Sequence, residues 1–186
     1  HEGLFSPLIQ NVLVSSFQEQ QVRNLRLPNF FIKENHLREK FVLANARVSS
    51  SSIYTKRILN SNQIVILFIG VRSGNYDNKG VITAHYILDE LANSDVFSIG
   101  IGCDDTLPLS LSISALDPAD IHQVISASDL TVITSRLETF SMVALESQFC
   151  KTPVVFRKSL APSSFDDSNY LYPAKDDSDR ALLDAV

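Results

Sequence analysis

The fold is specified most clearly by one stretch, residues 129–156: DLTVITSRLETFSMVALESQFCKTPVVF. Residues 129–135 are rich in β-branched and apolar side chains, and residues 153–156, PVVF, form a second short apolar run. Such runs are typical of buried strands. Between them lies a segment of helical length, and parallel strands need a crossover of this kind. The stretch therefore predicts two parallel strands joined by a helix.

The same alternation fills the preceding segments. IVILFIG at 64–70 and VFSIGIG at 96–102 are apolar runs that end in glycine. Between them, at 81–93, apolar residues repeat at helical spacing. Pro118 after Asp117 is typical of a helix start. A short strand is expected at 110–114, and a last helix opens within 176–186. This order predicts an α/β fold with a doubly wound, Rossmann-like parallel sheet over residues 61–186.

The first 60 residues lack this rhythm. Residues 11–17, NVLVSSF, are strand-like, and the Lys/Arg-rich patches with a serine run that follow indicate a linker and a lead-in helix. We therefore expect residues 1–60 to form an N-terminal arm rather than part of the sheet.

Composition excludes several classes of protein. Apolar residues make up 45% and charged residues 20% of the 186, which is ordinary for a soluble globular chain. The longest apolar run, 64–71, is far shorter than the roughly 20 residues of a transmembrane helix. A net charge of −5 disfavours a nucleic-acid binder. Two cysteines without metal-ligand spacing favour a reduced, cytoplasmic protein.

Two glutamates stand out in the turn and helix of the opening stretch. In open parallel sheets ligands bind beyond the carboxyl ends of strands, at helix N-termini whose free N–H groups attract phosphate. The amides around Phe140, Ser141 and Met142 would then hold a diphosphate. Glu138 lies in the turn and Glu146 eight residues further on, so each would accept hydrogen bonds from a different hydroxyl pair. A nucleotide sugar offers such pairs on its sugar and on its ribose.

Each glutamate also has a simpler interpretation. Glu138 before a helix complements the helix dipole, and a glutamate within a helix usually lies on a solvated face. The neighbours of Glu146 argue against the solvated face, since Val143, Ala144 and Leu145 precede it directly. A carboxylate among apolar side chains is costly unless it has a partner.

A second constellation follows the strand at 64–70. Gly70 ends the strand, Arg72 lies in the loop, and Lys79 with Gly80 opens the next helix. Both cations would lie at the carboxyl edge of the sheet and neutralise a diphosphate without an obligatory metal or other cofactor. The alternative is a solvated basic loop in which Asp77 pairs with either cation.

These motifs together resemble a known family. S-x-x-E-x-F-x-x-x-x-L-E, residues 135–146, with P-V-V at 153–155 and the upstream G-x-R and N-K-G, is similar to the C-terminal half of family 4 retaining glycosyltransferases of the GT-B fold. The resemblance implies that Arg72 and Lys79 grip the donor diphosphate and take part in catalysis with Glu138, which binds the sugar hydroxyls. It also implies that Glu146 binds the ribose and that the base lies near Ile113.

The resemblance also implies partners and a domain layout. A hexosyl group would pass, with retention, from a nucleotide-diphosphate sugar to a glycan or lipid-linked acceptor in polysaccharide biosynthesis. Residues 61–186 would be the donor-binding half, and residues 1–60 a remnant of the acceptor-domain edge with the interdomain linker. The remaining acceptor domain would be a missing partner, and this chain alone would bind nucleotide with little turnover. The expected location is cytoplasmic, at the inner membrane face.

The sequence departs from the family pattern at three places. Ser141 and Lys151 stand where the family usually has glycine, and residues 158–165, KSLAPSSF, lack a common glycine pair. Two alternatives therefore accompany the glycosyltransferase interpretation. One is a nucleotide-sugar epimerase of similar fold, which would need a further acid/base set. The other is a non-catalytic α/β nucleotide-binding or interaction module, with Ser141 as the trace of lost catalysis.

Overall fold

The structure is a computed structural model that describes residues 11–13, 30–32, 63–74, 76–138, 141–160 and 170–186. Two short strands, β1 (Asn11–Leu13) and β2 (Phe30–Ile32), pair in parallel. The later elements are β3 (Ile64–Ile69), α4 (Val81–Glu90), β4 (Val96–Ile101), β5 (Leu111–Ile113), α5 (Pro118–Ala127), β6 (Leu130–Ile133), α6 (Met142–Phe149), β7 (Val154–Phe156), the 3-10 turn η2 (Lys158–Leu160), β8 (Leu171–Pro173) and α7 (Asp179–Ala185).

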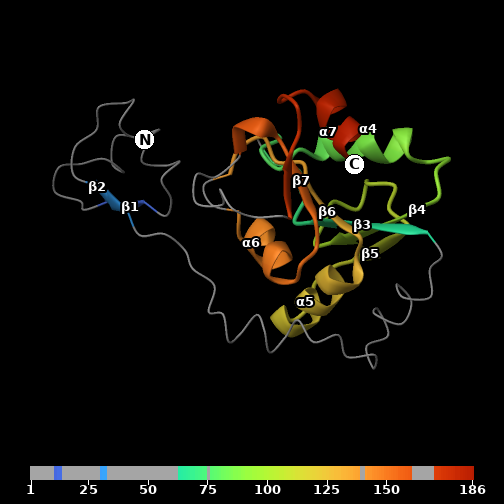
Figure 1. The fold of residues 1–186 in the computed structure, drawn as a ribbon, viewed down its shortest axis with the longest axis horizontal. Helices are drawn as coiled ribbons and strands as arrows, with labels where there is room; N and C mark the ends of the chain where they lie inside the picture. The colour runs from blue at the N-terminus through green and yellow to red at the C-terminus, as the bar shows by residue number, and fades with distance from the viewer. Residues whose placement is uncertain (1–10, 14–29, 33–62, 75, 139–140, 161–169) are drawn as a thin grey trace.

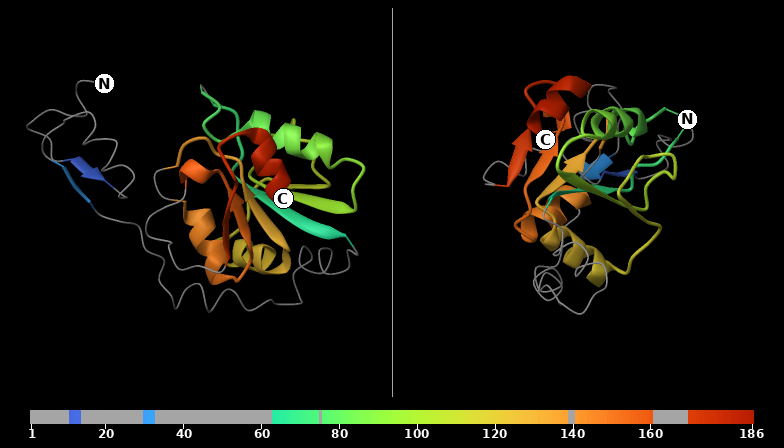
Figure 2. Two further views of the ribbon diagram at one scale, coloured as in Figure 1. Left: turned by 45° about the horizontal axis from the view of Figure 1, so that its top comes forward. Right: turned by 90° about the vertical axis from the view of Figure 1, so that its right-hand side faces the viewer.

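Six of these strands form one parallel sheet in the order β5-β4-β3-β6-β7-β8. Helices α4 and α7 cover one face of the sheet, and α5 and α6 cover the other, as Figures 1 and 2 show. The expected doubly wound, Rossmann-like fold is confirmed, because helices on both faces of a parallel sheet define it.

The central strand β3 is buried on both faces, as its unbroken apolar sequence predicts. Ile66 and Phe68 pack into the core beneath α4 and α7. Val65 and Leu67 point the other way and pack against the apolar side of α5. Side chains alternate across a strand, so a strand between two helical layers needs apolar residues at every position.

The topology creates a crevice between β3 and β6. The chain runs from β3 outward to β4 and β5, then returns to place β6 on the other side of β3. At the amino ends, the carboxylate of Asp129 accepts a hydrogen bond from the Val65 amide at 2.9 Å. The two strands pair at Ile66↔Leu130 and Leu67↔Thr131. The carboxyl ends of β3 and β6 therefore meet where the strand order reverses, and ligands of open α/β sheets bind at such a switch point.

Several elements differ from expectation. The short strands β2 and β8 are not evident in the sequence, because each has three residues and β8 ends in Pro173, which cannot donate to a ladder. β1 lies within the strand-like segment expected at 11–17. The lead-in helix and most of the N-terminal arm fall outside the described residues.

Two positions at the ends of helix α6 hold other residues where the family pattern has glycine. The structure accommodates the two residues in different ways. Ser141 is the N-cap, with φ −77°, and its hydroxyl accepts a hydrogen bond from the Ala144 amide at 3.3 Å. Lys151 follows the helix in the left-handed region, with φ +60°. Its amide bonds to the Gln148 carbonyl at 3.0 Å and the Thr152 amide to the Ser147 carbonyl at 2.9 Å, the pattern of a Schellman motif. Position 151 thus retains the conformation that favours glycine, whereas position 141 does not require it.

Candidate donor-binding cleft

A cleft of about 280 Å³ lies at the switch point of the sheet. Its walls come from the ends of β3 and β6, the turn before α4 and the start of α6, and include Gly70, Lys79, Thr134, Glu138, Ser141 and Met142. The structure thus brings together five of the residues expected at the site. Arg72, Ile113 and Glu146 do not line this cleft, and Phe140 falls outside the described residues.

The charged centre of the cleft is a contact between Lys79 and Glu138. The Lys79 Nζ lies 2.9 Å from Oε1 of Glu138, and the Ser135 hydroxyl donates to the same oxygen at 2.7 Å. The carboxylate is largely shielded, with 17% of the side chain exposed, whereas the lysine side chain is 49% exposed. Glu138 therefore has partners that fix its position, and Lys79 remains open to solvent on one side.

The two turns that carry this pair are in close contact. Gly80 has φ +68°, and a side-chain carbon added there would lie 2.1 Å from the Thr134 carbonyl oxygen. The Thr134 hydroxyl donates to the Lys79 carbonyl at 2.9 Å, and the Arg136 amide donates to the Asn78 carbonyl at 2.9 Å. Only glycine permits both this φ and this approach. Its role is therefore to place Lys79 beside the turn that follows β6.

The start of α6 forms another wall of the cleft. Met142 and Val143 line the cleft and are the first residues of α6. The first N–H groups of a helix have no carbonyl partner one turn back. The Ser141 hydroxyl accepts a hydrogen bond from the third of these groups, the Ala144 amide. The cleft therefore combines backbone donors, the positive end of a helix dipole and an ammonium group, which favour an anionic ligand.

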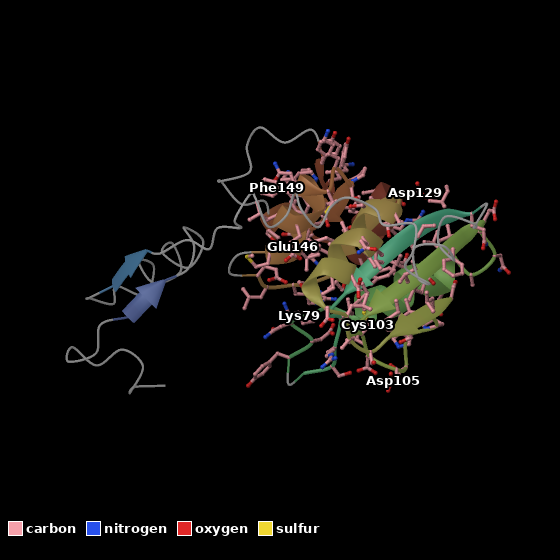
Figure 3. The ribbon with its side chains drawn as sticks, turned by 90° about the horizontal axis from the view of Figure 1, so that it is seen from below. Lys79, Cys103, Asp105, Asp129, Glu146 and Phe149 are labelled. Carbon is pink, nitrogen blue, oxygen red and sulfur yellow. The ribbon has the colours of Figure 1, made fainter. Side chains whose placement is uncertain are left out.

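Glu146 lies in different surroundings, on the side of α6 that faces α5. Its Oε1 is 3.8 Å from Nε2 of His122, and its side chain is 23% exposed, which excludes a fully solvated position. Burial raises the pKa of Glu146 above its ordinary value and lowers the pKa of His122. Figure 3 shows Glu146 on α6, Lys79 toward the carboxyl edge of the sheet and Asp129 toward the opposite edge. His122 is buried in the core.

Arg72 and Asp77 take partners that the sequence does not reveal. The Arg72 Nε donates to the Gly102 carbonyl at 2.6 Å, which places this cation at the end of β4, next to the strand that ends in Ile113. The structure does not show the alternative in which Asp77 pairs with Arg72 or Lys79. Its Oδ2 lies 3.6 Å from Nε of Arg136, and its Oδ1 accepts from the Val81 amide at 2.6 Å. Asp77 therefore anchors the start of α4.

The described residues contain no group of three or more His, Cys, Asp or Glu side chains that would hold a metal ion. Asp177 and Asp179 have Asp-x-Asp spacing, but the Asp179 carboxylate contacts Arg157 and Arg136. None of the helices in these parts of the chain is long and apolar enough to span a membrane.

Sequence reasoning missed two residues that line the cleft, Thr134 and Ser135, and one beside it, Arg136. Ser135 bonds to Glu138, Thr134 bonds to the Lys79 backbone, and Arg136 contacts Asp77. A signal existed for Ser135, since the S-x-x-E spacing places a hydroxyl within reach of the carboxylate. The roles of Thr134 and Arg136 depend on contacts between residues more than fifty positions apart.

The fold and the cleft together define a class: a doubly wound, Rossmann-like α/β domain with a ligand crevice at its switch point. Within this class, residues 110–179 match the family "Glycosyl transferases group 1". Over 96 residues the chain is 32% identical to a D-inositol 3-phosphate glycosyltransferase of Streptosporangium roseum, covering 50% of this chain and 18% of that protein.

Solved structures agree on the fold. A glycosyltransferase from Rickettsia africae superposes with a TM-score of 0.71 at 17% identity, over 98% of this chain and 54% of that one. WaaG, a glycosyltransferase involved in lipopolysaccharide biosynthesis, gives 0.68 at 14% identity, over 99% and 55%. Sucrose-phosphate synthase from Thermosynechococcus elongatus gives 0.64 at 18%, over 94% and 47%. The chain thus spans about half the length of these structures.

Proposed function

We propose that this chain is the donor-binding part of a retaining glycosyltransferase and holds a nucleotide-diphosphate sugar in the cleft between β3 and β6. The observation that carries the proposal is the Lys79–Glu138 contact at the switch point, 2.9 Å long and beside the start of α6. A cation for phosphate, a carboxylate for hydroxyls and free helix amides meet there. An anion of diphosphate size with an attached sugar would use all three.

Each part of the donor then has a proposed partner. Lys79 and the amides of Met142 and Val143 bind the diphosphate, with Arg72 approaching from the end of β4. Glu138 accepts hydrogen bonds from sugar hydroxyls, and Glu146 accepts them from the ribose. Gly70 leaves room for the ligand at the end of β3, and the base lies toward Ile113 on β5.

The proposed reaction follows from these positions. The bond between the anomeric carbon and the diphosphate oxygen breaks, and its electron pair leaves with the nucleoside diphosphate. Lys79, Arg72 and the helix amides stabilise the charge that develops on this oxygen, without an obligatory metal. An acceptor hydroxyl forms the new bond on the same face of a hexosyl group, and its proton passes to the departing phosphate.

The acceptor side of the reaction needs a second domain. The chain covers about half of each superposed glycosyltransferase, so we propose that an acceptor domain completes the cleft in the functional protein. The acceptor would be a glycan or a lipid-linked saccharide in surface polysaccharide assembly, at the cytoplasmic face of the membrane. The named relatives include an enzyme of lipopolysaccharide biosynthesis, which supports this choice.

Calorimetric titration of the 186-residue chain with UDP, GDP and ADP, and with their glucose conjugates, tests the proposal. We expect saturable binding of one nucleoside diphosphate. Each glutamate makes charge-assisted hydrogen bonds in the bound state, so its loss should weaken the affected ligand by about 10–100-fold. Glu146→Ala should weaken binding of the nucleoside diphosphate itself, whereas Glu138→Ala should weaken mainly the binding of the sugar-bearing donor.

Two results would contradict the proposal. Absence of saturable binding to every nucleotide would favour a non-catalytic interaction module. Equal and negligible effects of the two substitutions would remove the division of labour between the carboxylates.

A further inference from the structure

A charged cluster lies beside the cleft, between the carboxyl ends of β6 and β7 and the starts of α4 and α7. It consists of Asp77, Thr83, Arg136, Arg157 and Asp179. Arg157, at the end of β7, is only 2% exposed and contacts the Asp179 carboxylate. No residue of this cluster lines the cleft itself.

Arg136 connects three elements within this cluster. Its Nη2 lies 3.2 Å from Oδ2 of Asp179 on α7 and 3.3 Å from the Thr83 hydroxyl on α4. Its Nε faces Oδ2 of Asp77 at 3.6 Å. Because a guanidinium is planar and always charged, it can keep these partners in one fixed arrangement.

The backbone of Arg136 joins the same elements. Its amide donates to the Asn78 carbonyl at 2.9 Å, one residue before Lys79. Glu138 follows Arg136 by two residues in the same turn. The separation of Lys79 Nζ and Glu138 Oε1 thus depends on how Arg136 holds its turn against the turn before α4.

The carboxylate at the centre of the cluster is maintained in its charged form. Burial alone would raise the pKa of Asp179, but hydrogen bonds from Arg157 and Thr83 and the charges of both arginines lower it. The start of α7 is therefore a fixed negative anchor for Arg136 at neutral pH, 43 residues away in the chain.

We infer that Arg136 is a positioning residue that sets the distance between Lys79 and Glu138 by tethering their two turns to Asp77, Thr83 and the start of α7. One consequence of this inference rests on the proposed function. Arg136 then controls how well the site distinguishes a sugar-bearing donor from the bare nucleoside diphosphate. Arg136 acts through Glu138 and Lys79 and contacts no part of the donor.

The test uses the 186-residue chain with Arg136→Gln, Arg136→Lys and the control Arg180→Gln. Arg180 is an exposed arginine of α7 that pairs with Asp184 within the same helix, so its loss removes an equal charge elsewhere. In the ligand-free protein, NMR measures proton exchange of the Lys79 ammonium group, which is slow when the group is hydrogen-bonded to Glu138. Calorimetry then gives the affinity ratio of nucleotide-glucose to nucleoside diphosphate.

We expect Arg136→Gln to accelerate proton exchange at Lys79 and to lower the affinity ratio by about tenfold, the equivalent of one charge-assisted hydrogen bond. Arg136→Lys should give intermediate values, because an ammonium group replaces only part of the planar contact set. If the Gln variant does not fold, the Lys variant carries the same comparison. Arg180→Gln should leave both quantities unchanged.

Wild-type exchange at Lys79 together with a wild-type affinity ratio in the Arg136 variants would overturn the inference. A wild-type chain that binds none of the nucleotides would instead refute the proposed function. The exchange measurement needs no ligand, so it would still decide whether Arg136 positions the pair.

Discussion

Glu138 and Glu146 belong to one turn and helix, yet the structure gives them opposite surroundings. Glu138 accepts hydrogen bonds from Lys79 and Ser135 in a cleft at the carboxyl edge of the sheet. Glu146 faces the buried His122 of α5, and burial raises the pKa of Glu146. The first carboxylate has two hydrogen-bond donors in the free protein, whereas burial disfavours the charged form of the second.

This difference gives each carboxylate a distinct meaning. The contacts of the free protein explain the position of a carboxylate that has a lysine and a hydroxyl partner, although a ligand can replace those partners. A desolvated carboxylate without such donors costs stability, and residues that cost stability are common at functional sites. The position of Glu146 is therefore best explained by a ligand that it binds, whereas Glu138 is already held in place in the free protein.

The largest effect should come from disrupting the close contact between the two turns that places Lys79 beside Glu138. In Gly80→Ala the new carbon would approach the Thr134 carbonyl at 2.1 Å while the residue keeps φ +68°. Strain and overpacking each cost about 1–3 kcal/mol, so we expect a loss of about 2–6 kcal/mol in urea denaturation. The control Gly74→Ala has no atom within 4 Å of the new carbon. Equal stability of the two variants would show that the close approach is not formed in solution.

A smaller effect should come from removing the cation of the pair. Lys79→Met is expected to weaken binding of the nucleoside diphosphate by about 10–100-fold, since a charge-assisted hydrogen bond to phosphate is lost. The same substitution at Lys151, exposed beyond the end of α6, is the matched control. Calorimetric titration compares the two variants, and equal affinities would place the diphosphate elsewhere.

The smallest effect concerns the cost of Glu146. A carboxyl group whose pKa is raised by folding binds more protons in the folded state than in the unfolded state. Its cost is full at neutral pH and disappears as pH falls through the folded pKa toward the ordinary value of 4.5. Glu146→Gln should therefore raise stability at pH 7 by less than about 1 kcal/mol.

Thermal unfolding between pH 4 and pH 7 measures this prediction, and the advantage of Glu146→Gln should shrink as the pH falls. Glu90→Gln, on an exposed position of α4, is the control for the same change of charge. A Glu146 variant less stable than the wild type at pH 7 would mean that the carboxylate has a structural partner rather than a vacant binding role.

Much of the fold was predictable because its signals are local. The apolar run of β3, the helical spacing of α4 and the Asp-Pro start of α5 each lie within one element. The weak points were β2 and β8, strands of three residues whose pairing comes from their neighbours rather than from their own sequence. Of the site, the S-x-x-E spacing predicted a turn carboxylate at Glu138, with Ser135 as its observed partner.

By itself, the sequence determined the order of strands and helices, and with it the edge of the sheet at which a ligand would bind. The tertiary structure alone decided which charged groups meet there. Lys79 and Glu138 are 59 positions apart and touch because Gly80 allows two turns to come together. Arg72 and Asp77, predicted from the same loop, instead find partners at Gly102 and Arg136. Secondary structure depends on neighbours in the chain, but ion pairs depend on distances that only packing fixes.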